Sequence, residues 1–146
     1  MNTQDDHLHL AEPAPIFRDT DAFTCSFLVT ERLHEGFIGL FGDRNPLHVD
    51  DTFAIAKGFR ERVMHGNILG GFLSYFIGEC LPTKDVIIHS QEIQFKNAVY
   101  LYDVLTFEAK VYSVHESVNT VKFKFVFRNG EGKIVSKGML QIGLLS

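Results

Sequence analysis

Alternation of apolar and polar residues runs through the second half of this chain and limits what it can fold into. Valine and phenylalanine occupy positions 121, 123, 125 and 127, with Lys122, Lys124 and Val126 between them. Residues 105–111 alternate in the same way, and residues 87–95 do so toward their end. A period of two is that of a β-strand with one buried face. With residues 134–144 returning after the turn signal at 129–132, this half predicts four antiparallel strands.

The segment 68–80 is apolar nearly all round, which predicts a buried helix. Each of its glycines, Gly70, Gly71 and Gly78, costs about 1 kcal/mol of helix stability relative to alanine. We expect close approach of the sheet to the helix to compensate for this cost. The alternative is that the glycine pair breaks the helix.

Shorter elements precede that helix. A first strand is expected at 23–29, a helix at 31–41 and a second short helix at 51–57. Because a sheet with one apolar face needs a cover, the buried helix is expected to lie against it. The prediction is an α+β fold with one domain at 21–146. Residues 1–20 are polar and are expected to form a flexible N-terminal arm, in which His7 and His9 are solvated.

Length and charge exclude several classes of protein. At 146 residues the chain suits one domain with a substantial core. A formal net charge of -4 argues against a nucleic-acid binder, because phosphate contacts need clustered lysine and arginine. No apolar run reaches the roughly 20 residues that span a bilayer, so no membrane association is expected. The first residues are acidic and polar, unlike a signal peptide, and the expectation is a soluble cytoplasmic protein.

The segment from Phe41 to His48 carries the strongest chemical signal. It holds Asp43 and His48 five residues apart across a turn that Pro46 stiffens, because proline fixes its own φ and restricts the residue before it. A carboxylate and an imidazole on one constrained loop suit a pair that grips a water molecule between them. An ordinary turn capped by Asp43 is the alternative for the isolated tetrapeptide.

This segment, with Asp50 and then His65-Gly66, resembles the hydratase motif of the MaoC-like family, the (R)-specific enoyl-thioester hydratases. The resemblance extends over about residues 22–145. It implies a hot-dog fold, in which a curled antiparallel sheet wraps around a central helix. It also implies reversible, syn hydration of trans-2-enoyl thioesters to (R)-3-hydroxyacyl thioesters, without a metal or organic cofactor. Hot-dog domains usually pair, so a homodimer or dimer-based oligomer is expected, with an acyl tunnel along the interface.

The predicted site contains five residues. Asp43 and His48 are the catalytic pair. Gly66 stands just ahead of the buried helix, where backbone N–H groups are unsatisfied, so it is the candidate donor to the thioester oxygen, as the resemblance also implies. Ser74 matches a serine of the bacterial (R)-hydratases and is assigned to substrate binding on that basis. Asn45 is expected to support the loop and is placed with the substrate-binding residues.

Two neighbours of this site have simpler interpretations. His65 is expected to hold the loop by a hydrogen bond, and Asp50 to stand at the start of the helix at 51–57. The sequence departs from the family pattern in two places. The family usually has a proline soon after the Gln-x-x-x-Phe of its third strand, and here Lys96, Asn97 and Ala98 follow Phe95 instead. It usually has Gly-Asp before the next strand, and here the dipeptide is Tyr102-Asp103. These departures concern the acyl length and the carrier, which is coenzyme A or acyl carrier protein, more than the reaction.

Two other functions remain open at this point. Hot-dog thioesterases place a carboxylate on or beside the central helix, and this helix offers only Glu79 at its far end. A non-catalytic acyl-thioester-binding module would keep the pair as a relic. The intact pair of Asp43 and His48 favours a hydro-lyase over both.

Overall fold

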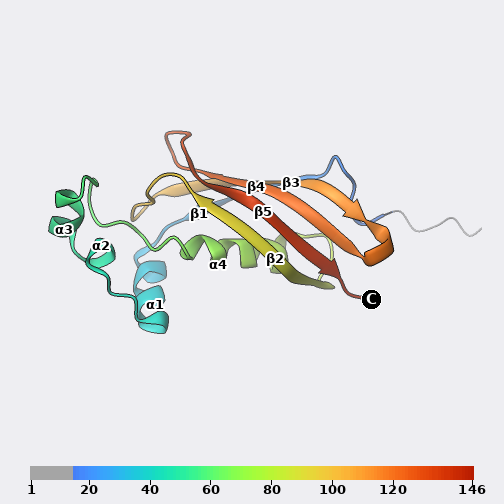
Figure 1. The fold of residues 1–146 in the computed structure, drawn as a ribbon, viewed down its shortest axis with the longest axis horizontal. Coiled ribbons are helices and arrows are strands. Elements are labelled where there is room, and N and C mark those ends of the chain that lie inside the picture. Colours follow the sequence, from blue (N-terminus) through green and yellow to red (C-terminus); the bar gives the residue numbers. More distant parts are fainter. Residues whose placement is uncertain (1–14) are drawn as a thin grey trace, which may run out of the picture.

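The computed structural model describes residues 15–146, which form one antiparallel sheet and a set of helices (Figure 1). The strands are β1 (Ala22–Leu28), β2 (Val86–Phe95), β3 (Val104–His115), β4 (Thr120–Arg128) and β5 (Ile134–Leu144), and they lie in the order β1-β3-β4-β5-β2. The helices are α1 (Glu31–Phe41), α2 (Pro46–Val49), α3 (Asp51–Ala56) and α4 (Ile68–Tyr75), with a π-helical turn η1 (Phe76–Cys80) and a 3-10 turn η2 (Glu116–Val118).

Helix α4 lies along one face of the sheet, and α1, α2 and α3 project beyond one end of it (Figure 1). This arrangement confirms the predicted α+β fold, with an antiparallel sheet around a central helix. Helix α4 passes directly into η1, so the glycine pair does not break it. None of the helices in residues 15–146 is long and apolar enough to cross a membrane.

The core lies between α4 and the inward face of the sheet. Phe107, Phe123, Phe125 and Phe127 are each at most 2% exposed, as the alternation of β3 and β4 predicted. Their rings meet one another and Phe76, whose centroid lies 4.9 Å from that of Phe107. Full burial of a phenylalanine contributes roughly 1.5–3 kcal/mol, so this cluster contributes substantially to stability.

Register shifts bend the sheet around the helix. They occur between Ile88 and Ser90 in β2, between Val111 and Ser113 in β3, and near Phe127 where β4 pairs with β5. An extra residue on one strand increases the local twist and bends the strand. The curl that wraps α4 therefore has a local cause in these three places.

The prediction that a sheet approaches the glycines of α4 is wrong. A Cβ atom on Gly71 or Gly78 would meet nothing within 4 Å, and one on Gly70 would lie an ordinary 3.8 Å from Gln91 Nε2. The expectation that the helix is buried on all sides is also wrong for this chain alone, because Gly71 and Tyr75 lie on an exposed side. The apolar residues of α4 that face the sheet, such as Leu73, are buried.

Phe17 ties the start of the described chain to the sheet. Its side chain is 3% exposed, and its ring lies 6.4 Å from Phe23 and 5.7 Å from Phe123. Residues 1–14, which include His7 and His9, lie outside the described part of the chain, and the flexible arm expected at 1–20 stays a prediction.

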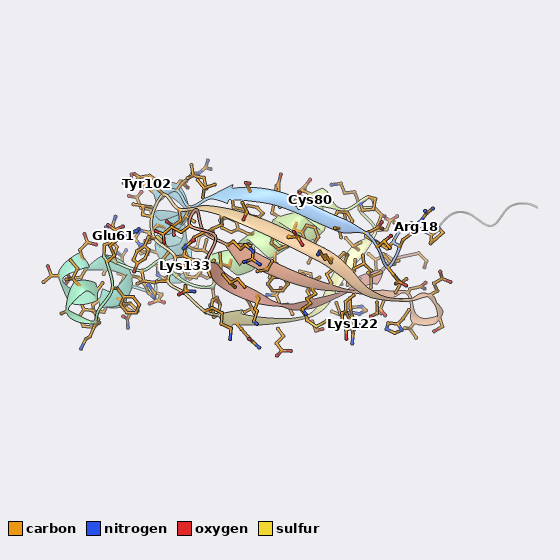
Figure 2. All side chains as sticks on the ribbon, turned by 90° about the horizontal axis from the view of Figure 1, so that it is seen from above. Arg18, Glu61, Cys80, Tyr102, Lys122 and Lys133 are labelled. Atoms are coloured by element: carbon orange, nitrogen blue, oxygen red, sulfur yellow. The ribbon has the colours of Figure 1, made fainter. Side chains whose placement is uncertain are left out.

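Tyr102 adopts a backbone conformation that favours glycine. Its φ is 67°, in the left-handed region, and its N–H donates to Val29 O at 2.7 Å. This conformation accounts for the glycine usually found here in the pattern that the sequence resembles. Figure 2 shows Tyr102 together with Glu61 and Lys133 at the end of the molecule that carries α1–α3.

Candidate active site

Helix α1 delivers Asp43 to the site through two caps. At its start, Thr30 Oγ1 accepts the N–H of Leu33 at 3.1 Å. At its end, Gly42 has φ 77°, and its N–H donates to Ile38 O at 2.8 Å. Glycine takes this left-handed conformation without steric cost, so the glycine of the motif is needed for the chain to turn here. Asp43 follows at once.

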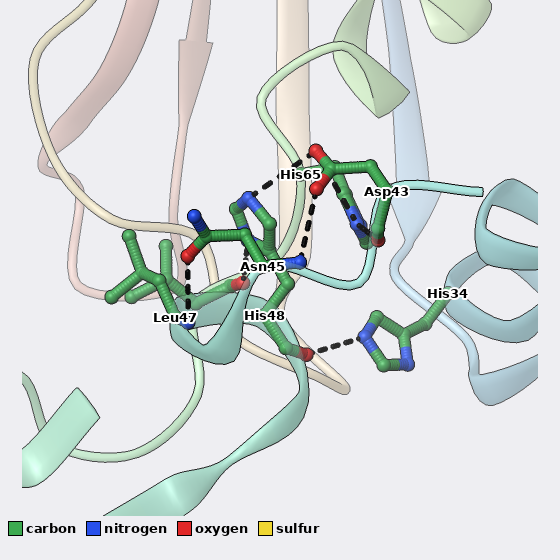
Figure 3. A network of polar contacts seen from close by, with 7 residues as sticks. His34, Asp43, Asn45, Leu47, His48 and His65 are labelled. Atoms are coloured by element: carbon green, nitrogen blue, oxygen red, sulfur yellow. Dashed lines mark hydrogen bonds and ion pairs between the residues drawn. The ribbon is translucent and has the colours of Figure 1, made fainter. Parts of the chain in front are cut away.

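The turn after Asp43 is built from side chains that accept backbone hydrogen bonds (Figure 3). Asp43 Oδ1 accepts from Asn45 N at 3.1 Å, and Asn45 Oδ1 accepts from Leu47 N at 3.0 Å. Asn45 thus caps α2, in which Pro46 takes the first position. His48 therefore lies in a one-turn helix, whereas the sequence predicted an irregular loop. Asn45 supports the loop as expected, and Asp43 also serves as an ordinary turn residue.

The imidazole of His48 is held by one nitrogen and presents the other to Asp43. Its Nδ1 lies 2.7 Å from Val63 O, so Nδ1 carries the proton and donates it. Its Nε2 lies 3.8 Å from Asp43 Oδ2. That gap is too long for a direct hydrogen bond, and a water molecule could bridge the two groups.

His65 contacts both Asp43 and His48. Its side chain is buried, its Nε2 donates to Asp43 O at 2.9 Å, and its ring centroid lies 4.0 Å from that of His48. Burial lowers the pKa of His65, so the ring is neutral and Nδ1 bears a lone pair. Among the described residues, that buried Nδ1 has no hydrogen-bond partner. The predicted structural role of His65 is confirmed.

A metal ion suits this cluster less well than a water molecule. Asp43, His48 and His65 offer ligand atoms within 4.8 Å of one another, and these residue types bind zinc. However, His65 Nε2 carries the proton that it donates to Asp43 O, so this nitrogen has no lone pair to offer. With His65 Nε2 engaged, Asp43 Oδ2 and His48 Nε2 are left as the ligand atoms beside the gap, and zinc sites in proteins use three or four.

Gly66 lies in the same cleft, and its backbone N–H is free. The cleft has a volume of about 530 Å³ and is lined by Asp43, His48, Gly66 and Asn67, among others. Within residues 15–146, the backbone N–H groups of Gly66 and Asn67 donate no hydrogen bond. A Cβ atom on Gly66 would lie 2.8 Å from the ring of Phe95, so only glycine fits unless that ring moves.

A second, apolar groove meets the cleft at Asp43. It has a volume of about 980 Å³ and lies between α1, α4 and β1, with Phe27, Phe41 and Phe72 in its lining. The groove and the cleft share Asp43 and Asn67. The carboxylate therefore stands where the groove and the cleft join.

The structure brings together Asp43, Asn45, His48 and Gly66, but Ser74 is placed apart from them. Ser74 lies on the exposed side of α4 and lines neither the cleft nor the groove. Sequence reasoning missed two residues at the site, His34 and Asn67. His34 lies on the apolar face of α1, and a single histidine among apolar residues could have indicated its role. Asn67 directly follows the His65-Gly66 pair, and this position could have indicated its place in the site.

Comparison with known proteins agrees with these features. The family model of the MaoC like domain matches residues 18–126. The chain is 36% identical over 80 residues to an (R)-specific enoyl-CoA hydratase of Aeromonas caviae, which is 55% of this chain and 60% of that protein. It is 32% identical over 102 residues to an (R)-specific enoyl-CoA hydratase of Rhodospirillum rubrum, which is 70% of each. The first of these alignments covers less than two thirds of the relative.

A solved structure gives the same picture over a longer span. The chain is similar to that of an (R)-hydratase from A. caviae involved in PHA biosynthesis, with a TM-score of 0.81 and 26% identity. The match covers 88% of this chain and 97% of that one. The sheet, the central helix and the projecting helices are thus shared over nearly the whole hydratase chain.

Proposed function

Because the chain belongs to the MaoC-like domain family, we propose that it is a hydro-lyase that adds water reversibly to trans-2-enoyl thioesters and gives (R)-3-hydroxyacyl thioesters. The observation that carries this proposal is the 3.8 Å gap between His48 Nε2 and Asp43 Oδ2. Asp43 Oδ1 and His48 Nδ1 are engaged with backbone groups, so Asp43 Oδ2 and His48 Nε2 remain to hold a water molecule between them. The names of the similar enzymes support the reaction and the R configuration.

A water molecule in that gap has the two partners that hydration requires. One proton leaves the water, its oxygen bonds to C3, the C2–C3 π bond breaks, and one proton reaches C2. Asp43 and His48 together take and deliver these protons, as a pair of general acid and base. Both act from one side of the cleft, so water adds to one face of the planar enoyl group, which accounts for a single enantiomer.

The free N–H of Gly66 serves the negative charge that develops on the thioester oxygen. It lies at the start of α4, where the helix dipole favours negative charge. Glycine at this place lets the carbonyl come close, since a side chain would collide with Phe95. Ser74 stays a predicted substrate contact. In the proposed dimer, a second copy of the chain covers this side of α4 and brings substrate near Ser74.

The two cavities divide the substrate between them. In this proposal the apolar groove takes the acyl chain, and the cleft takes the thioester and the start of its carrier, coenzyme A or acyl carrier protein. Phe72, Phe76 and Phe95 are the candidates for closing the acyl path. Phe72 lines the groove and Phe95 lines the cleft, while Phe76 is fully buried and lines neither. Phe72→Ala should shift turnover toward longer acyl chains, and an unchanged chain-length profile would remove Phe72 from this role.

A homodimer, or an oligomer built from dimers, is part of the proposal. Strand β2 is an edge of the sheet with unpaired backbone groups, and it exposes Ile87 and Ile88. The exposed side of α4, with Gly71 and Tyr75, is a second surface that a copy of the chain could cover. Light scattering at micromolar concentration tests this part, and a monomer would contradict it. A cytoplasmic location remains a prediction.

One assay tests the reaction against its alternatives. The protein is incubated with crotonyl-coenzyme A while the absorbance of the conjugated enoyl group and the release of free thiol are followed. The proposal predicts loss of the absorbance with the thioester intact. Thiol release would indicate a thioesterase, although the carboxylate of Glu79 is exposed and paired with Lys84 Nζ at 3.2 Å. No change with crotonyl-coenzyme A, and none when the crotonyl thioester of acyl carrier protein is used instead, would indicate a binding module.

A further inference from the structure

We infer that His34, on helix α1, is a positioning residue that holds His48 in its catalytic orientation. Its Nε2 lies 2.8 Å from the backbone carbonyl oxygen of His48, fourteen residues further along the chain. A carbonyl oxygen can only accept, so His34 Nε2 carries a proton and donates it. This inference rests on the proposed function, because it assigns His34 to the pair that performs the hydration.

The burial of His34 needs an explanation that packing alone does not give. The side chain is 6% exposed and lies on the same face of α1 as Ile38, which is 8% exposed. An apolar side chain would fill this space without the cost of removing an imidazole from water. Within residues 15–146, the one hydrogen bond of the His34 side chain ends on His48. The hydrogen bond to His48 therefore compensates for the cost of burying this imidazole.

The carbonyl of His48 needs such a donor because α2 is only one turn long. The last carbonyl groups of a helix have no partner within the helix. In α2, Leu47 O accepts from Val63 N at 2.9 Å, and His48 O accepts from the His34 side chain. The helix is thus attached by Val63 on one side and by α1 on the other.

These hydrogen bonds fix both ends of the catalytic residue (Figure 3). The ring of His48 is held at Nδ1 by Val63 O at 2.7 Å, and its backbone is held at the carbonyl by His34 at 2.8 Å. The ring of His65 packs against the ring of His48, with centroids 4.0 Å apart. Without the hydrogen bond from His34, the single turn could pivot about Val63. The gap of 3.8 Å between Nε2 and Asp43 Oδ2 would then no longer be maintained.

The test uses two variants that differ in one donor. In His34→Gln the amide nitrogen can take the place of the imidazole Nε2, and in His34→Leu no donor remains. With a short enoyl-coenzyme A, we expect kcat of His34→Leu to fall about 10- to 100-fold, because a displacement of about 1 Å costs that much. KM should stay within about twofold, since no group that binds substrate is changed. His34→Gln should recover most of kcat. Equal kcat in all three proteins would overturn the inference.

A double-mutant cycle separates positioning from a general loss of structure. His34→Leu is combined with Asp43→Asn, and the four rates are compared. If His34 acts through the pair, its removal should cost much less once the pair is already disabled. Effects on kcat that simply multiply would overturn the inference. Thermal unfolding of each variant shows that the compared proteins are folded.

A measurement without substrate keeps this inference apart from the proposed function. The proton on His48 Nδ1 can be followed by NMR in protein labelled with ¹⁵N on histidine. We expect it to exchange with water faster in His34→Leu than in the unmodified chain and in His34→Gln. Equal exchange in all three would overturn the positioning role. Failure of the unmodified chain to hydrate any enoyl thioester would instead overturn the proposed function.

Discussion

The sheet with its central helix and the segment that carries the site are held together in different ways. In the sheet, buried side chains such as Phe107 and Phe123 repeat every second residue and pack on α4. In the segment 42–66, no comparable apolar cluster exists among the described residues. Its turns are held by polar side chains on backbone groups, as with Asn45 on Leu47 N and His65 on Asp43 O.

This difference separates stability from activity. Apolar packing is spread over many side chains, so removal of one core side chain lowers stability but leaves the site geometry in place. A hydrogen bond at the site joins one donor to one acceptor, so its removal moves one particular catalytic atom. Variants in the two regions should therefore fail in opposite ways.

The largest effect is expected for conservative changes of Asp43 and His48, the proposed catalytic pair. Asp43→Asn keeps an oxygen for Asn45 N–H, and His48→Asn keeps a donor near Val63 O. Both should lower kcat by about 10²–10⁴, the usual contribution of a general acid or base. Their midpoints of thermal unfolding should match that of the unmodified chain. A variant with near-normal turnover would show that the pair is assigned wrongly.

A core variant is expected to lose stability rather than the geometry of the site. Phe107→Ala should lower the free energy of unfolding by about 3–5 kcal/mol, because it removes a ring that is 1% exposed and packed against other rings. Tyr112→Ala, on the same strand but 63% exposed, is the matched control and should cost far less. Urea unfolding measures both. Equal losses in the two variants would break the contrast between the regions.

A smaller effect, on pH dependence, should come from His65. Burial lowers the pKa of His65 in the folded protein. Above the unfolded-state pKa of about 6.5, both states are neutral and stability is complete. As pH falls below that value, the unfolded state takes up the proton first, so stability is lost. Unfolding midpoints should therefore drop as pH falls below about 6.5, and drop less in His65→Gln. A variant that loses as much as the unmodified chain would contradict this.

The smallest effect concerns Tyr102, whose φ is 67°. Tyr102→Gly and Tyr102→Ala both remove the ring, and they differ only in how well the backbone tolerates the left-handed region. The glycine variant should be more stable than the alanine variant by about 1 kcal/mol in urea unfolding. An alanine variant of equal or greater stability would mean that the backbone here is not strained.

The sequence predicted the strands and the helix whose residue patterns repeat along the chain. The alternation at 105–111 and 121–127 predicted β3 and β4. The apolar run at 68–80 predicted one helix, which the structure forms as α4 followed by η1. The closeness of Asp43 and His48 could be predicted because a stiffened turn keeps both residues within a few positions. Such signals are local, and each reflects the period or geometry of one element.

The hydrogen bonds that orient the site escaped prediction because they join distant residues without any period. His34 reaches His48 across fourteen residues, and His65 reaches Asp43 across twenty-two. The exposed side of α4 was missed for another reason. An apolar helix in a sequence does not tell which part of its surface its own chain covers, as Gly71 and Tyr75 show. The strain at Tyr102 has no sequence period either.

The most direct test of the account is a chiral analysis of the product from crotonyl-coenzyme A. The unmodified chain and Asp43→Asn are incubated side by side in equal amounts. The account predicts (R)-3-hydroxybutyryl-coenzyme A from the unmodified chain and, at equal times, about 10²–10⁴ less of it from Asp43→Asn. An S or racemic product, or full activity in Asp43→Asn, would contradict the claim that water is added from the gap between Asp43 and His48.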